Sequence, residues 1–332
     1  MITGEIAKKL IENLERVIKG KTEVLRLFVT AFLSGGHVLI EDVPGTGKTT
    51  LVKTLAASIQ ADDNVAKFQR IQCTPDLLPY DITGVEVFNM ASQTFDFVKG
   101  PVFCDVLLAD ELNRTPPKVQ SALLEVMAEK QVTFGKKTYP LSDLFFVAAT
   151  QNPVESLGVY PLPAAQLDRF MFLLSIGYPE FEAELEILQT DPSEAVLPEI
   201  STVVSIAEIN QCKKEQANVF VHPALQKAII EICNITRKHP GIELGASPRA
   251  GLQLLKASKT LALIEGRTWV EDIDIKALSS HLFAHRLILN DRNIDGKKLV
   301  DEIVLDALNK MDRVEKWEKP DFQKTSENPS IS

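Results

Sequence analysis

One short stretch of the chain combines glycines, a lysine and a threonine at a spacing that suits binding of a phosphate chain. Gly45 and Gly47 lack a Cβ, so the backbone around them can curl and turn its N–H groups toward an anion. Lys48 would reach the β- and γ-phosphates of a nucleotide, and Thr49 would offer its hydroxyl to Mg²⁺. The full pattern has another glycine where this sequence has Asp42, so the stretch departs from it at one position.

The residues around this stretch predict the local structure that it needs. An apolar run over residues 38–40 predicts a strand, and a helical pattern with Leu51 and Leu55 follows the glycines. A loop between a strand and a helix holds an anion at the helix N-terminus, where the partial positive charge of the helix lies. An ordinary strand–turn–helix connection is the alternative, and it is disfavoured because later parts of the chain supply suitable partners.

Two adjacent carboxylates, Asp110 and Glu111, follow an apolar run over residues 106–109. The run predicts a buried strand, and open parallel sheets bind ligands at the carboxyl ends of their strands. Asp110 would therefore lie near the phosphate loop and hold Mg²⁺, mostly through water. Glu111 would polarise the attacking water. A surface acidic turn is the simpler alternative, and the order of the two motifs argues against it.

A third apolar run, over residues 144–150, predicts another strand, and Asn152 follows it. An amide at that strand end can hydrogen-bond both a γ-phosphate and the water beside it. Asn before Pro is also a common turn, so a purely structural role stays open. A Pro-initiated helical pattern then ends at Arg169, before a last predicted strand over residues 172–176.

Two segments between these strands predict β-hairpins. Residues 85–88 and 94–98 alternate like strands and interrupt a short helix that we expect to begin at Thr74. This first hairpin is either a surface decoration or a contact element, and the sequence favours neither. Residues 131–142 predict a second, smaller hairpin.

The overall composition is that of a globular protein, with 45% hydrophobic and 24% charged residues. The net charge is −9, and the basic residues come as scattered pairs rather than a stripe, which argues against a nucleic-acid surface. The four cysteines have no C-x-x-C spacing, so neither a disulfide framework nor a zinc site is indicated. No apolar run approaches the ~18–20 residues of a membrane span, and residues 1–16 do not resemble a signal peptide. The cytoplasm is the expected compartment.

At 332 residues the chain exceeds one comfortable core, so we expect two domains. The first is an α/β nucleotide-binding core over residues 1–190, with the hairpin insert near residues 82–100. The second, over residues 191–316, is helical, with helices near 206–214, 223–238, 248–264, 271–289 and 297–312. Residues 317–332 predict a disordered tail.

Several motifs occur in an order that resembles AAA+ ATPases: the phosphate loop and residues 107–111, 149–153, 167–170 and 247–250. More narrowly, residues 17–289 resemble the MoxR family. The phrases that carry this narrower resemblance are residues 70–72, 74–79, 81–84, 100–103, 110–114 and 160–163. The resemblance implies an α/β P-loop core, with a parallel sheet flanked by helices, followed by a smaller all-α lid.

The resemblance also implies ATP and Mg²⁺ as cofactors and assigns binding roles by position. The Walker A segment and the threonine after it give the expected phosphate-binding residues, which are Pro44, Gly45, Thr46, Gly47, Lys48, Thr49 and Thr50. Thr49 and Asp110 would hold the metal. Val17, Ile18 and Gly20 resemble the segment that packs on the adenine ring.

The catalytic residues that the resemblance implies are Glu111, Asn152, Arg169 and Arg249. Glu111 belongs to Walker B, and Asn152 matches sensor 1. Arg169 matches the arginine finger, which reaches into a neighbouring subunit. Arg249 matches sensor 2 on the helical lid, and we expect it to supply a cation to the phosphates of its own subunit.

MoxR proteins form rings, usually hexamers, and are described as chaperone-like ATPases that often act beside proteins with von Willebrand factor A domains. The resemblance therefore implies ATP-driven remodelling, maturation or metal-centre assembly of protein partners. A chelatase-type subunit and a nucleic-acid motor or loader on the same core stay open as alternatives. The acidic charge argues against the motor. A nucleotide-gated scaffold without turnover is disfavoured because all four catalytic candidates are present.

Overall fold

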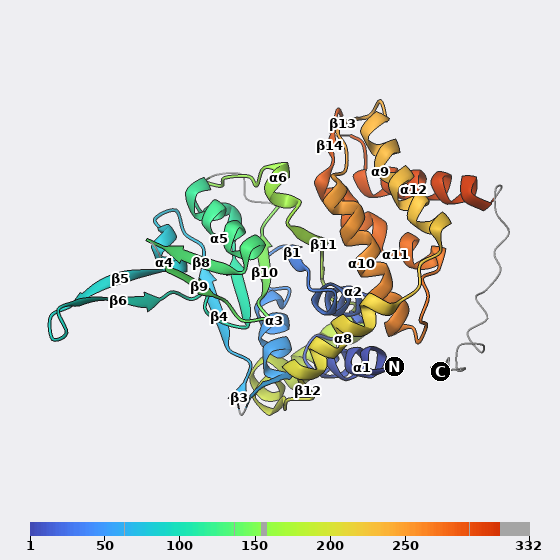
Figure 1. Cartoon of the computed structure of the whole chain (residues 1–332). Helices are drawn as coiled ribbons and strands as arrows, with labels where there is room; N and C mark the ends of the chain where they lie inside the picture. Colours follow the sequence, from blue (N-terminus) through green and yellow to red (C-terminus); the bar gives the residue numbers. More distant parts are fainter. Residues whose placement is uncertain (63, 136, 154–157, 292, 313–332) are drawn as a thin grey trace, which may run out of the picture.

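The computed structural model describes residues 1–312 apart from 63, 136, 154–157 and 292. An α/β core lies beside a group of helices, and a two-stranded arm extends from the core on the side away from those helices (Figure 1). The predicted tail over residues 317–332 falls outside the described residues. Within the described ranges, no helix is both long and apolar enough to cross a membrane.

A five-stranded sheet in the order β11–β1–β10–β7–β4 forms the centre of the core, and its pairings are parallel. Its strands are β1 (His37–Glu41), β4 (Phe68–Gln72), β7 (Val106–Asp110), β10 (Phe146–Gln151) and β11 (Phe170–Leu174). Every residue of β7 is buried, as expected of a parallel strand covered on both faces. The predicted α/β core with a parallel sheet is confirmed.

Helices cover both faces of this sheet. On one face lie α1 (Ile2–Glu15), α2 (Thr22–Leu33) and α3 (Lys48–Ala57), and on the other lie α4 (Pro79–Thr83) and α5 (Pro117–Glu129). The side chains of β1 alternate accordingly, because Val38 and Ile40 belong to the first hydrophobic cluster and Leu39 belongs to the second.

The helical group after the core contains α8 (Ile206–Asn218), α9 (Pro223–Lys238), α10 (Pro248–Ile264), α11 (Asp272–Phe283) and α12 (Gly296–Asp312). These helices confirm the predicted pattern with one difference. The helix expected over residues 271–289 ends at Phe283, and η4 (Ala284–Arg286) and β14 (Ile288–Leu289) follow. β14 pairs antiparallel with β13 (Ile242–Leu244). Residues 288 and 289, which we expected at the end of the helix, therefore belong to a two-stranded sheet.

One hydrophobic cluster runs from Ile6 in α1 to Leu308 in α12 and joins the core to the helical group. Helix α1 contacts both α8 and α10, and α2 contacts α10. The two parts therefore share packing, and we keep a domain division near residue 190 as a proposal.

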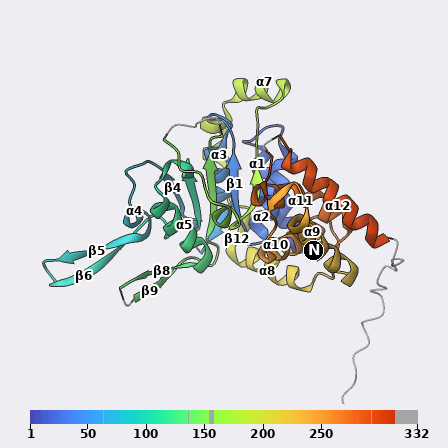
Figure 2. The same ribbon diagram turned by 90° about the horizontal axis from the view of Figure 1, so that it is seen from above.

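The segment that connects the two parts begins with α7 (Phe181–Thr190), which stands away from the body of the molecule (Figure 2). It continues through the short turns η2 (Pro192–Val196) and η3 (Leu197–Glu199) into β12 (Val204–Ser205). β12 pairs with β2 (Ile59–Ala61), and β2 also pairs with β3 (Asn64–Val65). No residue of α7 is buried, and the side chains of Phe181 and Leu188 are largely exposed to solvent.

The two predicted hairpins are confirmed. The arm in Figure 1 consists of β5 (Gly84–Asn89) and β6 (Thr94–Lys99), and β8 (Gln131–Phe134) pairs with β9 (Lys137–Pro140). The helix before the arm begins at Pro79 rather than near Thr74, because the Asp81 carboxylate caps the backbone N–H of Leu78. The remaining short elements are η1 (Leu112–Arg114) and α6 (Ala164–Leu167).

Candidate functional site

The phosphate loop lies between the end of β1 and the start of α3, as the sequence predicts. Gly45 and Gly47 both have φ of +85°, a left-handed conformation that side chains with a Cβ rarely adopt. Gly47 directly precedes the first helical residue, Lys48. The loop therefore presents the N-terminus of α3, where unpaired N–H groups and the helix dipole favour an anion.

Lys48 bends back over this loop. Its Nζ donates hydrogen bonds to the carbonyl oxygens of Asp42 at 3.0 Å and Val43 at 2.6 Å. Partial burial lowers the pKa of Lys48, and the nearby carboxylates of Asp42, Asp110 and Glu111 oppose that shift. An ammonium group in this position is held by neutral carbonyls, so it is available to pair with a phosphate.

Asp42, at the position where the full motif has glycine, has a definite structural role. Its carboxylate accepts hydrogen bonds from the backbone N–H of Ile176 at 2.5 Å and of Gly177 at 3.1 Å, and from the Ser175 hydroxyl at 2.9 Å. These donors follow the end of β11. Asp42 thus links the start of the phosphate loop to the segment that follows β11, the edge strand beside β1.

The two adjacent carboxylates lie at the carboxyl end of β7. The Thr150 hydroxyl connects them, because it donates to Asp110 Oδ1 at 2.7 Å and accepts from the backbone N–H of Glu111 at 2.8 Å. Glu111 has φ of +60°, an uncommon backbone conformation for a residue with a side chain. Its Oε2 accepts from Gln72 Nε2 at 3.1 Å and lies 3.2 Å from Arg114 Nε.

One pocket brings the predicted phosphate-site residues together. Its lining includes Lys48, Thr49, Asp110, Glu111 and Asn152, which come from the loop and from the ends of β7 and β10. The Thr49 hydroxyl and the Asp110 carboxylate are oxygen donors of the kind that Mg²⁺ prefers. The residues present therefore fit a magnesium ion bound beside a nucleotide phosphate.

A second pocket adjoins the first and shares Pro44, Gly45, Gly47, Thr50 and Ser193 with it. Most of the other lining is apolar, with Val17, Ile18, Ile176, Tyr178, Pro179, Ile187 and Leu188, and the pocket is also lined by Thr46, Lys19, Lys21 and Glu184. Such a wall suits the base of a nucleotide whose phosphates lie in the first pocket. Gly20 does not line it but forms the turn beside it, with φ of +68°.

Arg169 and Arg249 line a different pocket, together with His37 at the start of β1. Arg169 directly precedes β11, whose first residue, Phe170, pairs with His37. The pocket thus lies at the amino ends of the strands, whereas the phosphate loop follows their carboxyl ends. One strand of five residues separates the two, which corresponds to about 16 Å. The expectation that Arg249 reaches the phosphates of its own subunit is therefore wrong for this conformation.

The histidine of the pocket that Arg169 and Arg249 line does not add to its positive charge. Burial lowers the pKa of His37 to about 4, and Lys130 acts in the same direction. The neutral ring accepts a hydrogen bond at Nδ1 from the Val147 N–H, and its Nε2 lies 3.4 Å from the Met127 carbonyl oxygen. His37 has a structural role here.

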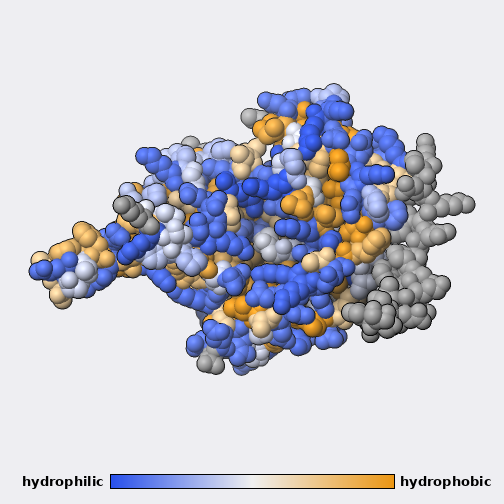
Figure 3. Space-filling model, viewed as in Figure 1, coloured by the Kyte–Doolittle hydropathy of each residue, from blue (hydrophilic) through white to orange (hydrophobic). Residues whose placement is uncertain are grey.

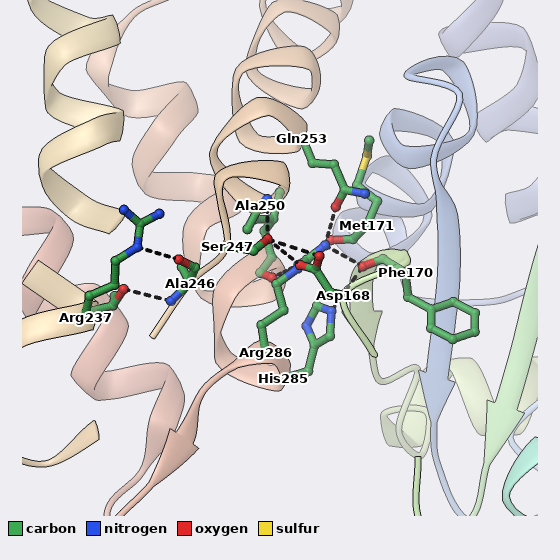
Figure 4. Close-up of polar contacts among 12 residues, drawn as sticks. Asp168, Phe170, Met171, Arg237, Ala246, Ser247, Ala250, Gln253, His285 and Arg286 are labelled. Atoms are coloured by element: carbon green, nitrogen blue, oxygen red, sulfur yellow. Dashed lines mark hydrogen bonds and ion pairs between the residues drawn. The ribbon is translucent and has the colours of Figure 1, made fainter. Parts of the chain in front are cut away.

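A polar network around Asp168, Ser247 and Arg286 lies next to the two arginines in the sequence (Figure 4). Ser247, which caps the N-terminus of α10, donates to both oxygens of Asp168 at 2.9 and 3.0 Å. Arg286, almost fully buried, pairs with Asp168 at 3.1 Å and donates to the Phe170 carbonyl at 2.6 Å. Burial lowers the pKa of Arg286 to about 10, and Asp168 opposes that shift. The network joins the end of α6 to α10 and η4.

Several of these residues are absent from the sequence-based site. Arg70, Gln72 and Thr150 contact the carboxylates, and Asp168 and Arg286 connect the two parts of the chain. The available signal for the first group was polar side chains at the ends of predicted strands. The signal for Arg286 was a lone arginine, directly after His285, within the otherwise apolar residues 282–289.

A parallel sheet in this order, a phosphate loop after β1, paired carboxylates at the end of β7 and a helical group together define an AAA+ ATPase. The central strand β10 lies between β1 and β7 and contributes Thr150 to the same end of the sheet. Residues 37–172 match the ATPase family associated with various cellular activities (AAA), and residues 234–306 match the AAA lid domain. The predicted class and the predicted lid are thereby confirmed.

Individual proteins give the narrower assignment. The chain is 44% identical over 300 residues to the uncharacterized protein YeaC of Bacillus subtilis, with 89% of this chain and 92% of that protein covered. It is 40% identical over 291 residues to Chaperone MoxR1 of Mycobacterium tuberculosis, covering 85% and 75% respectively. The crystal structure of a proposed ATPase from Cytophaga hutchinsonii superposes with a TM-score of 0.83 at 38% identity, covering 92% and 94%. The chain belongs to the MoxR family of AAA+ ATPases.

Proposed function

We propose that this ATPase works as a hexameric ring, as is usual for MoxR proteins, and that a neighbouring subunit completes each nucleotide site. The observation that carries the proposal is the position of Arg169 and Arg249 in one pocket at the end of the sheet opposite to Lys48. Two guanidinium groups that cannot reach the phosphates of their own chain suit the γ-phosphate of the next chain. An arginine supplied from outside can raise a phosphoryl-transfer rate by ~10³–10⁵.

Within one subunit, the proposed hydrolysis depends on Mg²⁺ held by Thr49 and Asp110. That ion, when bound, neutralises phosphate charge and orients the γ-phosphate. Glu111 polarises the attacking water, and Asn152 hydrogen-bonds the γ-phosphate or that water. Lys48 exchanges its carbonyl partners for the β- and γ-phosphates.

The remaining contacts that we propose hold the nucleotide itself. The residues concerned are Val17, Ile18 and Gly20 beside the adenine, and Pro44, Gly45, Thr46, Gly47 and Thr50 along the phosphates. The shared lining of the two pockets supports a single ligand that spans both.

We propose that the energy of hydrolysis is used for chaperone-like remodelling of protein partners in the cytoplasm, including proteins with von Willebrand factor A domains. The relative from Mycobacterium tuberculosis carries the name of a chaperone, which supports this proposal. The projecting arm formed by β5 and β6 offers an exposed surface for such a partner, with Phe88, Met90 and Phe95 all exposed.

Mixing two inactive variants tests the ring. Arg169→Ala should bind ATP nearly normally and hydrolyse it poorly, and Lys48→Ala should not bind ATP. In a mixed ring, an intact phosphate loop of the first variant can meet Arg169 of the second. The mixture should therefore regain part of the ATPase activity under conditions where sedimentation shows co-assembly.

A mixture of Lys48→Ala with Glu111→Gln is the matched control. Both of these changes affect the same end of the subunit, so no neighbour can complete either site, and this mixture should stay inactive. An Arg169→Ala and Lys48→Ala mixture that co-assembles but is no more active than its components would refute the role of Arg169 in a neighbouring site.

A further inference from the structure

Arg70 is the cation that the structure places directly on Asp110. The residue lies in the middle of β4, beside β7 in the sheet. Its Nη2 and Nε lie 2.6 and 3.2 Å from Asp110 Oδ2, and Nη2 also donates to Gln72 Oε1 at 2.7 Å. Arg70 lines the same pocket as Lys48 and Thr49.

Both oxygens of Asp110 are engaged by these contacts. Thr150 donates to Oδ1, and the guanidinium of Arg70 occupies Oδ2. A divalent cation that uses Asp110, directly or through a bound water, needs the negative charge and lone pairs of the same carboxylate. The guanidinium and the divalent cation therefore compete for the negative charge of one carboxylate.

The two partners differ in their freedom to move. The Asp110 side chain is 12% exposed, whereas the Arg70 side chain is 45% exposed. Asp110 lies at the end of a fully buried strand and is held by Thr150. Arg70 is thus the partner that can leave, and ion pairs with one exposed partner are weak enough to exchange.

We propose that Arg70 is a placeholder cation, which neutralises Asp110 when no divalent cation is bound and is displaced from Oδ2 when the metal arrives. This inference rests on the proposed magnesium site. Its consequence is that Arg70 competes with the metal, so the wild-type chain binds a divalent cation less tightly than a chain without that guanidinium.

Titration with Mn²⁺, followed by electron paramagnetic resonance in the absence of nucleotide, measures this competition. Arg70→Gln should bind Mn²⁺ about two- to fivefold more tightly than wild type, the range set by a partly exposed ion pair. Lys227→Gln, an exposed lysine of α9, removes the same charge far from the pocket and should bind Mn²⁺ like wild type. Arg70→Gln combined with Asp110→Asn should lose the gain, because the acceptor carboxylate is gone.

Unchanged or weaker Mn²⁺ binding by Arg70→Gln would overturn the proposal, and so would an equal gain in Lys227→Gln. Failure of both wild type and Arg70→Gln to bind Mn²⁺ also counts against it. A repeat of the titration with excess ADP separates competition from direct binding of phosphate. Tighter Mn²⁺ binding by Arg70→Gln in both titrations supports the placeholder, whereas a gain that reverses with ADP makes Arg70 a phosphate ligand and contradicts it.

The result is independent of turnover. If the wild-type protein hydrolyses ATP but Arg70→Gln leaves the Mn²⁺ affinity unchanged, only this inference is contradicted, and the proposed function stands. Wild-type protein that binds Mn²⁺ through Asp110 but never hydrolyses ATP would contradict the proposed function and leave the competition intact.

Discussion

Ser247 donates a hydrogen bond to Asp168, and each of these residues closely precedes an arginine in the sequence. Asp168 directly precedes Arg169, and Ser247 lies two residues before Arg249. One side-chain contact between the core and the helical group therefore joins the two backbone segments that carry these arginines, and both arginines line one pocket. If both act on a neighbouring nucleotide, as we propose, the pair moves as a unit whenever the helical group moves.

Removal of the Asp168 carboxylate should be strongly destabilising. In Asp168→Ala, the buried guanidinium of Arg286 loses its ion-pair partner, and breaking a buried pair in this way costs about 3–5 kcal/mol. Urea denaturation measures the change in the free energy of unfolding. Asp306→Ala is the matched control, because Asp306 forms a 2.6 Å pair with Lys310 on the surface and should change stability by less than about 1 kcal/mol. Equal stability of Asp168→Ala and wild type would show that the network contributes nothing.

Two substitutions should separate binding from chemistry. Lys48→Ala should abolish ATP binding, because the loop loses the charge that faces the phosphates. Glu111→Gln should bind ATP without hydrolysing it, since the amide keeps the shape of the side chain and loses the base. Fluorescent nucleotide binding and phosphate release measure the two steps. Lys53→Ala, an exposed lysine on the same helix α3, should retain both, and a fully active Glu111→Gln would contradict the assignment of Glu111.

Shortening the arm should affect a partner and spare the ATPase. Glu86 pairs with Phe97 across the arm, so residues 87–96 can be replaced by Asn-Gly, which favours a two-residue hairpin turn. Phe97, which stacks on Tyr139 at 4.3 Å, stays in place and keeps the base of the arm attached. The shortened protein should retain basal ATPase activity and lose partner-dependent activity.

The surface of the arm supports this design. Hydrophobic and hydrophilic residues are both exposed on it in the space-filling view (Figure 3), and Met90 in the turn between its strands is 85% exposed. Met90→Ser should reproduce part of the effect without changing the length of the arm. A collapsed melting transition of the shortened protein would instead show that the arm belongs to the core.

Acid should destabilise the protein through His37. Its pKa is lowered from 6.5 to about 4 in the folded state, so the unfolded chain binds more protons between these values. The free energy of unfolding should therefore fall by about 3 kcal/mol as the pH decreases from 6.5 to 4, and lie on a plateau for this group above pH 6.5. Burial also lowers the pKa of His285, which adds to the same trend.

The variant His37→Asn isolates the contribution of this ring. It removes the titrating group while keeping an acceptor near the Val147 N–H, so its stability should depend less on pH over that window. His239→Asn, at a partly exposed position, is the matched control for the change from histidine to asparagine itself. Identical pH profiles for His37→Asn and wild type would show that the ring is not the source of the trend.

The sequence was sufficient to predict the phosphate site because local patterns determine its parts. Each apolar run becomes a parallel strand, and the carboxyl ends of parallel strands meet at one edge, so Lys48, Asp110 and Asn152 had to come together. Arg70 escaped prediction because its role depends on β4 pairing with β7, a contact between distant segments. The start of α4 was also predicted at the wrong residue. The sequence suggested Thr74 as the N-cap, whereas the helix begins at Pro79 and the Asp81 side chain accepts a hydrogen bond from the Leu78 N–H.

The position of Arg249 could not follow from local patterns. It depends on how the helical group packs on the core, through α10 against α2 and α1 and through contacts such as that between Ser34 and Thr260. Periodicity identifies the helix and its serine cap, but the direction in which its first turn points is set by long-range packing. An arginine in that turn can therefore be recognised from the sequence while its target subunit cannot.

Asp42 shows that the backbone torsion angles of the phosphate loop, rather than an exact match to the sequence motif, determine which of its positions need glycine. Left-handed backbone occurs at Gly45 and Gly47, whereas Asp42 is not among the described residues with positive φ. The loop therefore has no steric need for glycine at its first position, and a search that insists on one would pass over this chain. The side chain gained there links the loop to Ile176 and Gly177, and Ile176 lines the proposed base pocket. The phosphate chain and the base of a bound nucleotide would thus contact two segments that the Asp42 side chain connects directly.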